Sequence, residues 1–141
     1  MKTLRQFGMM LLMALMLFSF TSCSDDEIEP EHTPIPYLKI MEAPDQYKNA
    51  VFELDSSEHA VTVTCLTNVN NLIIDIERYP WIAVESKQVK EDPESNNVFH
   101  YQIYSFRIAA NETSEDRVGL ITIKGGNHGE VIEIHQDSVT P

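Results

Sequence analysis

The stretch Ala60–Leu66, AVTVTCL, decides the fold class, because apolar and polar side chains alternate along it. Its two valines and its cysteine share one face, and its two threonines share the other. Successive side chains of a β-strand point to opposite faces of a sheet, so this pattern predicts a strand with one buried and one wet face. Antiparallel sheets that cover a core on one side only produce this alternation.

Short segments with the same rhythm lie on both sides of this stretch, separated by turn-forming residues. No segment after residue 22 has a convincing helical period. About seven or eight short strands therefore predict an all-β protein, an antiparallel β-sandwich. The further strands are expected at Tyr37–Met41, Ala50–Leu54, Leu72–Glu77, Trp81–Val84, Val98–Ala110, Val118–Lys124 and Glu130–Gln136.

Two connections and one irregular strand are also predicted. Lys87–Asn97 is polar and contains a proline, so it is expected to be a loop, and Gly125–Gly129 is expected to be a hairpin turn. Within Val98–Ala110 the apolar residues change phase by one position between Ile103 and Tyr104. A β-bulge in this strand would produce that shift.

The N-terminal junction FSFTSCSDDE predicts a lipid anchor. Two basic residues, Lys2 and Arg5, precede an apolar run over Phe7–Phe20. This run is shorter than the ~20 apolar residues of a membrane-spanning helix. A positive start, an apolar run and small residues before a cysteine are typical of a bacterial lipoprotein signal peptide, residues 1–22, cleaved before Cys23. The alternative is an ordinary secretory signal with a chance cysteine.

The residues after the cysteine resemble the export signal of Bacteroidetes lipoproteins, which sends them to the outer face of the outer membrane. These residues are Ser24, Asp25, Asp26 and Glu27. The other interpretation is a solvated acidic linker. Residues 23–36 as a whole are acidic and rich in proline, so we expect a tether that buries no core. Several acyl chains on Cys23 would anchor the protein stably at the cell surface.

The charge of the chain excludes nucleic acid as a partner. Eight of the ten Lys and Arg and all 22 Asp and Glu lie after residue 22, which leaves a net charge of −14 there. Phosphate binding needs clustered basic side chains. Anionic lipid headgroups are disfavoured for the same reason, so the membrane is expected to be contacted through the lipid anchor only.

Lipidation of Cys23 leaves Cys65 without a disulfide partner, since the chain has two cysteines. Cys65 is in phase with the two valines before it, so we expect a buried hydrophobe rather than a reactive thiol. Roughly 105 residues remain after the tether, enough for one sandwich-sized domain that its core must stabilise.

Four segments in the C-terminal half form an ordered set: PWIAV at 80–84, YSFRIAAN at 104–111, RVGLITI at 117–123 and VIEIHQ at 131–136. This set resembles the BACON family, the Bacteroidetes-associated carbohydrate-binding often N-terminal domains. The resemblance implies an immunoglobulin-like β-sandwich, here over residues 37–141. Family members often lie beside glycoside hydrolases and proteases. Carbohydrate or mucin binding has been proposed for them, and some resemble spacers.

The residues that match the family motif are Trp81, Asn111, Arg117, Gly119 and Gln136. Each also has a structural interpretation. Trp81 can pack between the sheets or offer a platform to a sugar. Arg117 can pair with a nearby acid or a strand end, and Gly119 permits close packing or a bulge. Asn111 suits a turn, and Gln136 can satisfy backbone groups at a sheet edge.

The sequence contains none of the usual catalytic or nucleotide-binding motifs. Its acids are too numerous for a glycosidase pair to be chosen by counting. The acidic loop Glu112–Asp116 could bind calcium, but it lacks the alternating oxygen ligands of a dedicated site. We therefore expect no enzyme activity, no metal and no cofactor.

Sugar binding requires aromatic rings that cover the apolar face of a pyranose and polar groups that bond its hydroxyls. The candidates are Tyr79, Trp81, Tyr101 and Tyr104, with Tyr37 and Tyr47 in addition. The alternative for each is a half-buried sandwich aromatic. The sequence thus predicts a surface-exposed lipoprotein that binds a glycan or mucin without catalysis. A second hypothesis is a spacer, or a partner subunit that assembles with neighbouring surface lipoproteins.

Overall fold

Eight β-strands make up the part of the chain that the computed structural model describes, residues 34–45 and 48–139. These two ranges contain no helix, and hence none that could cross a membrane. The strands are β1 (Leu38–Ile40), β2 (Ala50–Leu54), β3 (His59–Thr67), β4 (Ile73–Asp75), β5 (Ile82–Glu91), β6 (His100–Ile108), β7 (Arg117–Gly125) and β8 (His128–Gln136).

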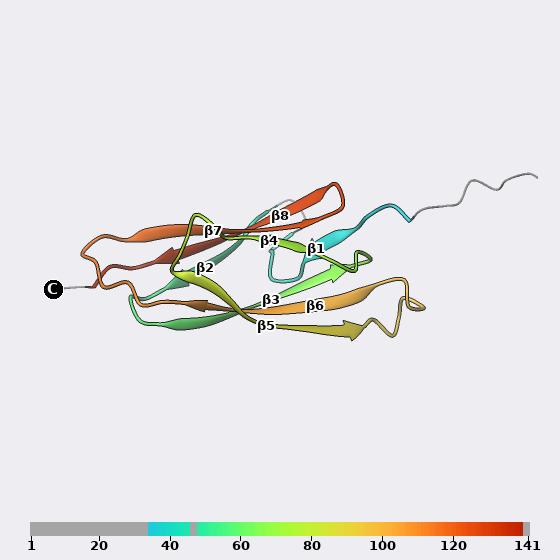
Figure 1. Ribbon diagram of the computed structural model, residues 1–141, viewed down its shortest axis with the longest axis horizontal. Coiled ribbons are helices and arrows are strands. Elements are labelled where there is room, and N and C mark those ends of the chain that lie inside the picture. Colours follow the sequence, from blue (N-terminus) through green and yellow to red (C-terminus); the bar gives the residue numbers. More distant parts are fainter. Residues whose placement is uncertain (1–33, 46–47, 140–141) are drawn as a thin grey trace, which may run out of the picture. The chain divides into compact units, whose positions relative to one another are not determined.

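The strands form two four-stranded sheets, seen as two layers in Figure 1. Sheet A has the order β1-β3-β6-β5, and sheet B has the order β2-β8-β7-β4. All neighbouring strands in these sheets are antiparallel except β2 and β8, which run parallel. The predicted immunoglobulin-like β-sandwich is confirmed, and the parallel pair at one edge of sheet B departs from the purely antiparallel arrangement that we expected.

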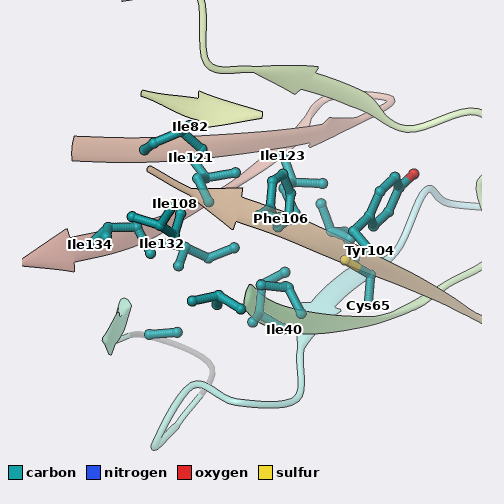
Figure 2. Close-up of a cluster of buried hydrophobic side chains, with 14 residues drawn as sticks. Ile40, Cys65, Ile82, Tyr104, Phe106, Ile108, Ile121, Ile123, Ile132 and Ile134 are labelled. Atoms are coloured by element: carbon teal, nitrogen blue, oxygen red, sulfur yellow. The ribbon is translucent and has the colours of Figure 1, made fainter. Parts of the chain in front are cut away.

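The core lies between the inward faces of the two sheets (Figure 2). Alternate residues of the four central strands point inward, and their apolar side chains are almost fully buried. The cluster joins Phe106 and Ile108 of sheet A to Ile121 and Ile132 of sheet B. Burying a side chain of this size contributes roughly 1.5–3 kcal/mol, so the core can stabilise the domain without a disulfide.

Cys65 is one of these core residues, as its position in AVTVTCL predicts. Its side chain is fully buried and its thiol is free. Burial raises the pKa of the Cys65 thiol to about 12, because the thiolate would lose its hydration. The group therefore behaves as a small hydrophobe rather than as a nucleophile.

Strand β5 is longer than its sequence suggests. The expected loop over Lys87–Asn97 is wrong in its first half, because β5 continues through Glu91. Every residue from Val84 to Glu91 is exposed. Because neither face of this segment is buried, its sequence does not show the alternation of apolar and polar residues that marks a half-buried strand. Pairing with β6 supplies the hydrogen bonds that keep this polar segment extended.

The bulge predicted in Val98–Ala110 is also wrong. The register of β6 against β3 runs unbroken along both strands, and the irregularity lies in β5, between Val84 and Ser86. Gln102 explains the false phase shift, because this polar residue occupies a fully buried inward position. Its Nε2 donates to the carbonyls of Val69 and Asn70, and its Oε1 accepts from the Tyr104 hydroxyl.

The predicted hairpin turn connects β7 to β8 and is reduced to two residues, Gly126 and Asn127. Gly126 has a φ of 60°, in the left-handed region that glycine adopts without strain. A positive φ at the first central position matches the II′ turns that suit two-residue hairpins.

Candidate functional site

Four of the five residues of the family motif, Trp81, Arg117, Gly119 and Gln136, contact one another at one end of the sandwich, and we call this group the motif network. The Arg117 guanidinium donates from Nε and Nη2 to Oε1 of Gln136, at 3.0 and 2.8 Å, and from Nη2 to the Ala109 carbonyl at 2.6 Å. The Gln136 amide in turn donates to the Ser57 carbonyl at 2.8 Å. These bonds tie β7 and β8 to the end of β6 and to the turn between β2 and β3.

Trp81 belongs to the same network. The Arg117 guanidinium lies over the indole ring, 4.2 Å from its centroid, and the Trp81 carbonyl accepts a bond from the Ala109 amide at 2.9 Å. A Cβ on Gly119 would lie 2.7 Å from the Trp81 ring, so only glycine leaves room for the indole. The ring is partly buried against the core. Trp81 therefore takes the structural role that we weighed against a sugar platform.

Asn111 organises the loop between β6 and β7. Its fully buried amide donates to the carbonyls of Glu115 and Asp137, at 2.8 and 2.9 Å, and its Oδ1 accepts from the Thr113 hydroxyl. Asp116, the last residue of the acidic loop, accepts a bond from the Ser138 amide. These contacts hold the loop closed. In residues 34–45 and 48–139, no group of three or more His, Cys, Asp or Glu is placed to hold a metal ion.

The turn between β2 and β3 brings together Asp55, Ser57 and His59, residue types that could suggest nucleophilic catalysis. The geometry differs from that of a catalytic relay. His59 uses the same Nε2 toward Ser57 Oγ at 3.2 Å and Asp55 Oδ1 at 2.8 Å, whereas a relay needs both ring nitrogens. Asp55 also accepts from the Ser57 amide at 2.8 Å, as an Asx turn does. Bonds from Ser57 and His59 hold the pKa of the Asp55 carboxyl at about 2.

Tyr104 is a correction to the predicted sugar-binding set. It points inward from β6 and is only 3% exposed, with its hydroxyl bonded to Gln102. Its ring stacks on Phe106 at a centroid distance of 6.2 Å. Gln102 is polar although it points inward, so the apolar residues of β6 did not reveal which face is buried. The sequence therefore left open which face of the strand carries Tyr104. A buried ring has no free face for a ligand.

Tyr101 lies on the opposite, outward face of sheet A, where two further aromatic residues join it. Leu38, Thr67 and His100 share one inward row across β1, β3 and β6. Tyr37 and Phe99, the residues just before β1 and β6, therefore fall on the outward face. Their rings meet edge to face at a centroid distance of 5.2 Å. Tyr37 is 37% exposed, and the other two rings are partly exposed.

We call the surface formed by Tyr37, Phe99 and Tyr101 the aromatic face. It lies at the end of sheet A opposite the motif network, since it surrounds the start of β6 and the motif surrounds the end of that strand. Sequence reasoning named Tyr37 and Tyr101 but missed Phe99. Phe99 could have been found because it lies two positions before Tyr101, and residues two apart in a strand point to the same face.

The strand register determines which residues lie beside the aromatic face. Residues that face one another across neighbouring strands form a row that runs across the sheet. One row crosses all four strands of sheet A, with the residues Lys39, Leu66, Tyr101 and Lys90 in that order. The next row contains Thr64, Ile103 and Gln88. The Tyr101 ring thus has aliphatic side chains, a hydroxyl, an amide and two ammonium groups among its neighbours. All of these project from the outward face of sheet A, which is turned away from sheet B.

Tyr79 lies elsewhere, at a small hollow beside β4. The hollow has a volume of about 160 Å³ and is lined by Asp75, Ile76, Arg78, Tyr79, Leu120 and Thr122. The Tyr79 ring also contacts Trp81 edge to face, at 6.1 Å, and is partly buried against the core. Pockets that enclose a ligand measure about 300–1,000 Å³, so this hollow could admit only part of one.

The remaining predicted site residues lie outside the described part of the chain. These are the lipidation residue Cys23, the export-signal residues Ser24, Asp25, Asp26 and Glu27, and Tyr47.

The geometry defines a β-sandwich domain. Its motif residues make contacts within the fold, and its partly exposed aromatic residues gather on the outward face of one sheet. Residues 73–137 match the model of the BACON family, described as "Putative binding domain, N-terminal". The BACON resemblance is therefore confirmed for this segment, which begins at β4 and ends one residue after β8. The strands β1, β2 and β3 precede the match yet belong to the same two sheets.

The solved structures that are similar to this chain include the following two. One is a Bacteroides ovatus GH5 xyloglucanase in complex with a XXXG heptasaccharide, with a TM-score of 0.45 and 13% identity over 74% of this chain. The chain spans 19% of the length of that enzyme. The other is an NMR structure of a protein from Bacteroides thetaiotaomicron, with a TM-score of 0.40 and 17% identity over 79% of this chain and 95% of that one. No curated protein matches the chain.

Proposed function

We propose that this protein is a surface-exposed bacterial lipoprotein whose BACON domain binds carbohydrate without catalysis. The observation that carries the proposal is the aromatic face, where Tyr37, Phe99 and Tyr101 gather on one open side of sheet A. The family match supports a binding role for the domain. The lipoprotein signal with Cys23 and the acidic residues after it support a position at the cell surface.

The chemistry of the aromatic face suits a sugar. A pyranose has an apolar face that an aromatic ring can cover, and Tyr101 supplies such a ring near one end of the outward face of sheet A. The hydroxyl of Thr64 and the amide of Gln88 lie one row away and can bond sugar hydroxyls. Within the described residues, neither side chain has a hydrogen-bond partner that this would break, so binding would demand little rearrangement.

A glycan array probed with the full-length protein tests this function, and two single variants locate the site. Tyr101→Ala should weaken binding by about tenfold or more, because a central aromatic anchor usually contributes over 1 kcal/mol. Ile73→Ala is the control, since Ile73 is 65% exposed on the other sheet and should leave binding unchanged. Equal binding by wild type and Tyr101→Ala would reject the aromatic face, and Tyr79→Ala would then test the hollow.

A spacer or partner subunit is the second candidate function. It is favoured by the motif network, because the motif residues satisfy one another and the family likeness therefore requires no ligand. Under this alternative the array stays empty, and crosslinking on intact cells captures neighbouring surface lipoproteins. Glycan binding that Tyr101→Ala abolishes would argue against it.

A further inference from the structure

Two lysines enclose the aromatic ring at the centre of the aromatic face. Lys90 is the direct cross-strand neighbour of Tyr101, and Lys39 stands at the other end of the same row, beyond Leu66. Neighbouring strands are about 4.8 Å apart, so the backbone positions of the two lysines are about 14 Å apart, with Tyr101 between them. A ligand on the ring therefore has an ammonium group within reach on both sides.

Neither lysine has an acidic partner in the described part of the chain, and among the other described cations the same holds for Arg78, Lys87 and Arg117 but not for Lys48, Arg107 and Lys124. Lys48 pairs with Asp45, Lys124 pairs with Asp75, and Arg107 approaches Glu58 and Glu85. Within residues 34–45 and 48–139, neither Lys39 nor Lys90 has a carboxylate within ion-pair distance. Their cross-strand neighbours are Leu66 and Tyr101, so the row is not stabilised by alternating charge as many sheet faces are.

Unpaired positive charge is notable in a protein that carries a net charge of −14 after residue 22. The protein as a whole repels anions, yet the row through Tyr101 presents two ammonium groups and no carboxylate. The Glu42 carboxylate lies near the next row, where it accepts from the Thr64 amide at 2.9 Å. Within the Tyr101 row itself, two ammonium groups beside an aromatic ring complement a ligand that is both flat and acidic.

From this row we infer that the carbohydrate bound by the aromatic face is acidic, bearing carboxylate or sulfate groups. The inference rests on the proposed function and adds the ligand class to it. One sugar ring stacks on Tyr101, and acidic groups on that sugar or its neighbours contact Lys90 and Lys39. An acidic peptide would satisfy the lysines as well, but it offers no apolar pyranose face to the partly exposed Tyr101 ring.

The test uses the full-length protein on an array where sialylated, uronate-containing and sulfated glycans stand beside their neutral counterparts, together with poly-glutamate. The variants are Lys39→Gln/Lys90→Gln and, as a control with the same change in net charge, Lys48→Gln/Lys124→Gln. We expect acidic glycans to bind more tightly than their neutral counterparts. The first variant should lose about two- to thirtyfold in affinity for them, and the control should lose little.

Each other result overturns a defined part of the inference. Equal binding of acidic and neutral glycans would reject the ligand class and leave the proposed function standing. Equal losses in both double variants would assign the preference to overall charge rather than to this row. Binding to poly-glutamate alone would replace the sugar with an acidic protein segment. An empty array would overturn the inference and the proposed function together.

Discussion

The guanidinium of Arg117 lies 4.2 Å from the centroid of the Trp81 ring, and the same guanidinium holds Gln136 through two hydrogen bonds. Residues from β7, β8 and the start of β5 thereby form one structural unit. The most recognisable residues of the family motif thus serve the sandwich itself. The surface for which we propose ligand binding is a different one, on the outward face of sheet A around Tyr101.

Gly119→Ala should destabilise the fold by about 1–3 kcal/mol, since overpacking of a well-filled core costs that much. The new methyl group would lie 2.7 Å from the Trp81 ring and 2.8 Å from Ile82. Urea unfolding would measure the change. Gly129→Ala is the matched control, because its Cβ would meet nothing closer than the Lys124 side chain at 3.7 Å. Equal stability of both variants would refute the packing argument.

Arg117→Lys should cost about 1–3 kcal/mol, although the charge is kept. Lysine cannot reproduce the forked contact with Gln136 and the Ala109 carbonyl while covering the indole ring. Thermal and urea unfolding would show the loss. Arg107→Lys should change stability by less than about 0.5 kcal/mol, because its two ion pairs are exposed and 3.7 Å long. A neutral Arg117→Lys would show that the network is not stabilising.

Stability should fall in acid, and Asp55 should account for part of the fall. The folded pKa of Asp55 is about 2, below its ordinary value of 3.8, because Ser57 and His59 bond the carboxylate. A lowered folded pKa contributes stability that is complete above the unfolded pKa. This contribution is lost as the pH falls from about 3.8 to about 2.

Urea unfolding of wild type and Asp55→Asn between pH 7 and pH 2 measures this contribution, and the variant should show a shallower decline below pH 4. Asp116 and Glu133, whose pKa values hydrogen bonding also lowers, should leave some decline in the variant. Burial raises the pKa of Glu130, which opposes the trend. Parallel curves for the two proteins would contradict the role of Asp55.

The Cys65 thiol should resist modification while the protein is folded. It is fully buried, and its pKa of about 12 leaves almost no thiolate at pH 8. A Cys23→Ser variant leaves Cys65 as the single cysteine of the chain, so a chromogenic thiol reagent reports on it alone. Modification should be at least about a hundredfold slower than in urea, because the reagent must wait for unfolding. Rapid reaction of the native variant would show that Cys65 is accessible.

Much of the fold could be predicted from the sequence. Alternation in AVTVTCL placed Val61, Val63 and Cys65 in the core, and the structure buries all three. The parallel pairing of β2 with β8 was missed because it depends on the whole sheet. The other errors arose where the local pattern was misleading. Gln102 is polar but buried, with hydrogen bonds to a distant loop, and β5 is exposed on both faces from Val84 onward.

The sequence by itself determined the fold class, the buried cysteine and the family segment, because side-chain alternation and motif order are properties of neighbouring residues. Only the tertiary structure decided which aromatic residues meet. Tyr37 and Phe99 are far apart in the chain, and they touch because β3 pairs with both β1 and β6. The same register brings Lys39 and Lys90 to the two ends of the Tyr101 row. Cross-strand neighbours depend on pairing across the whole sheet, which no local pattern contains.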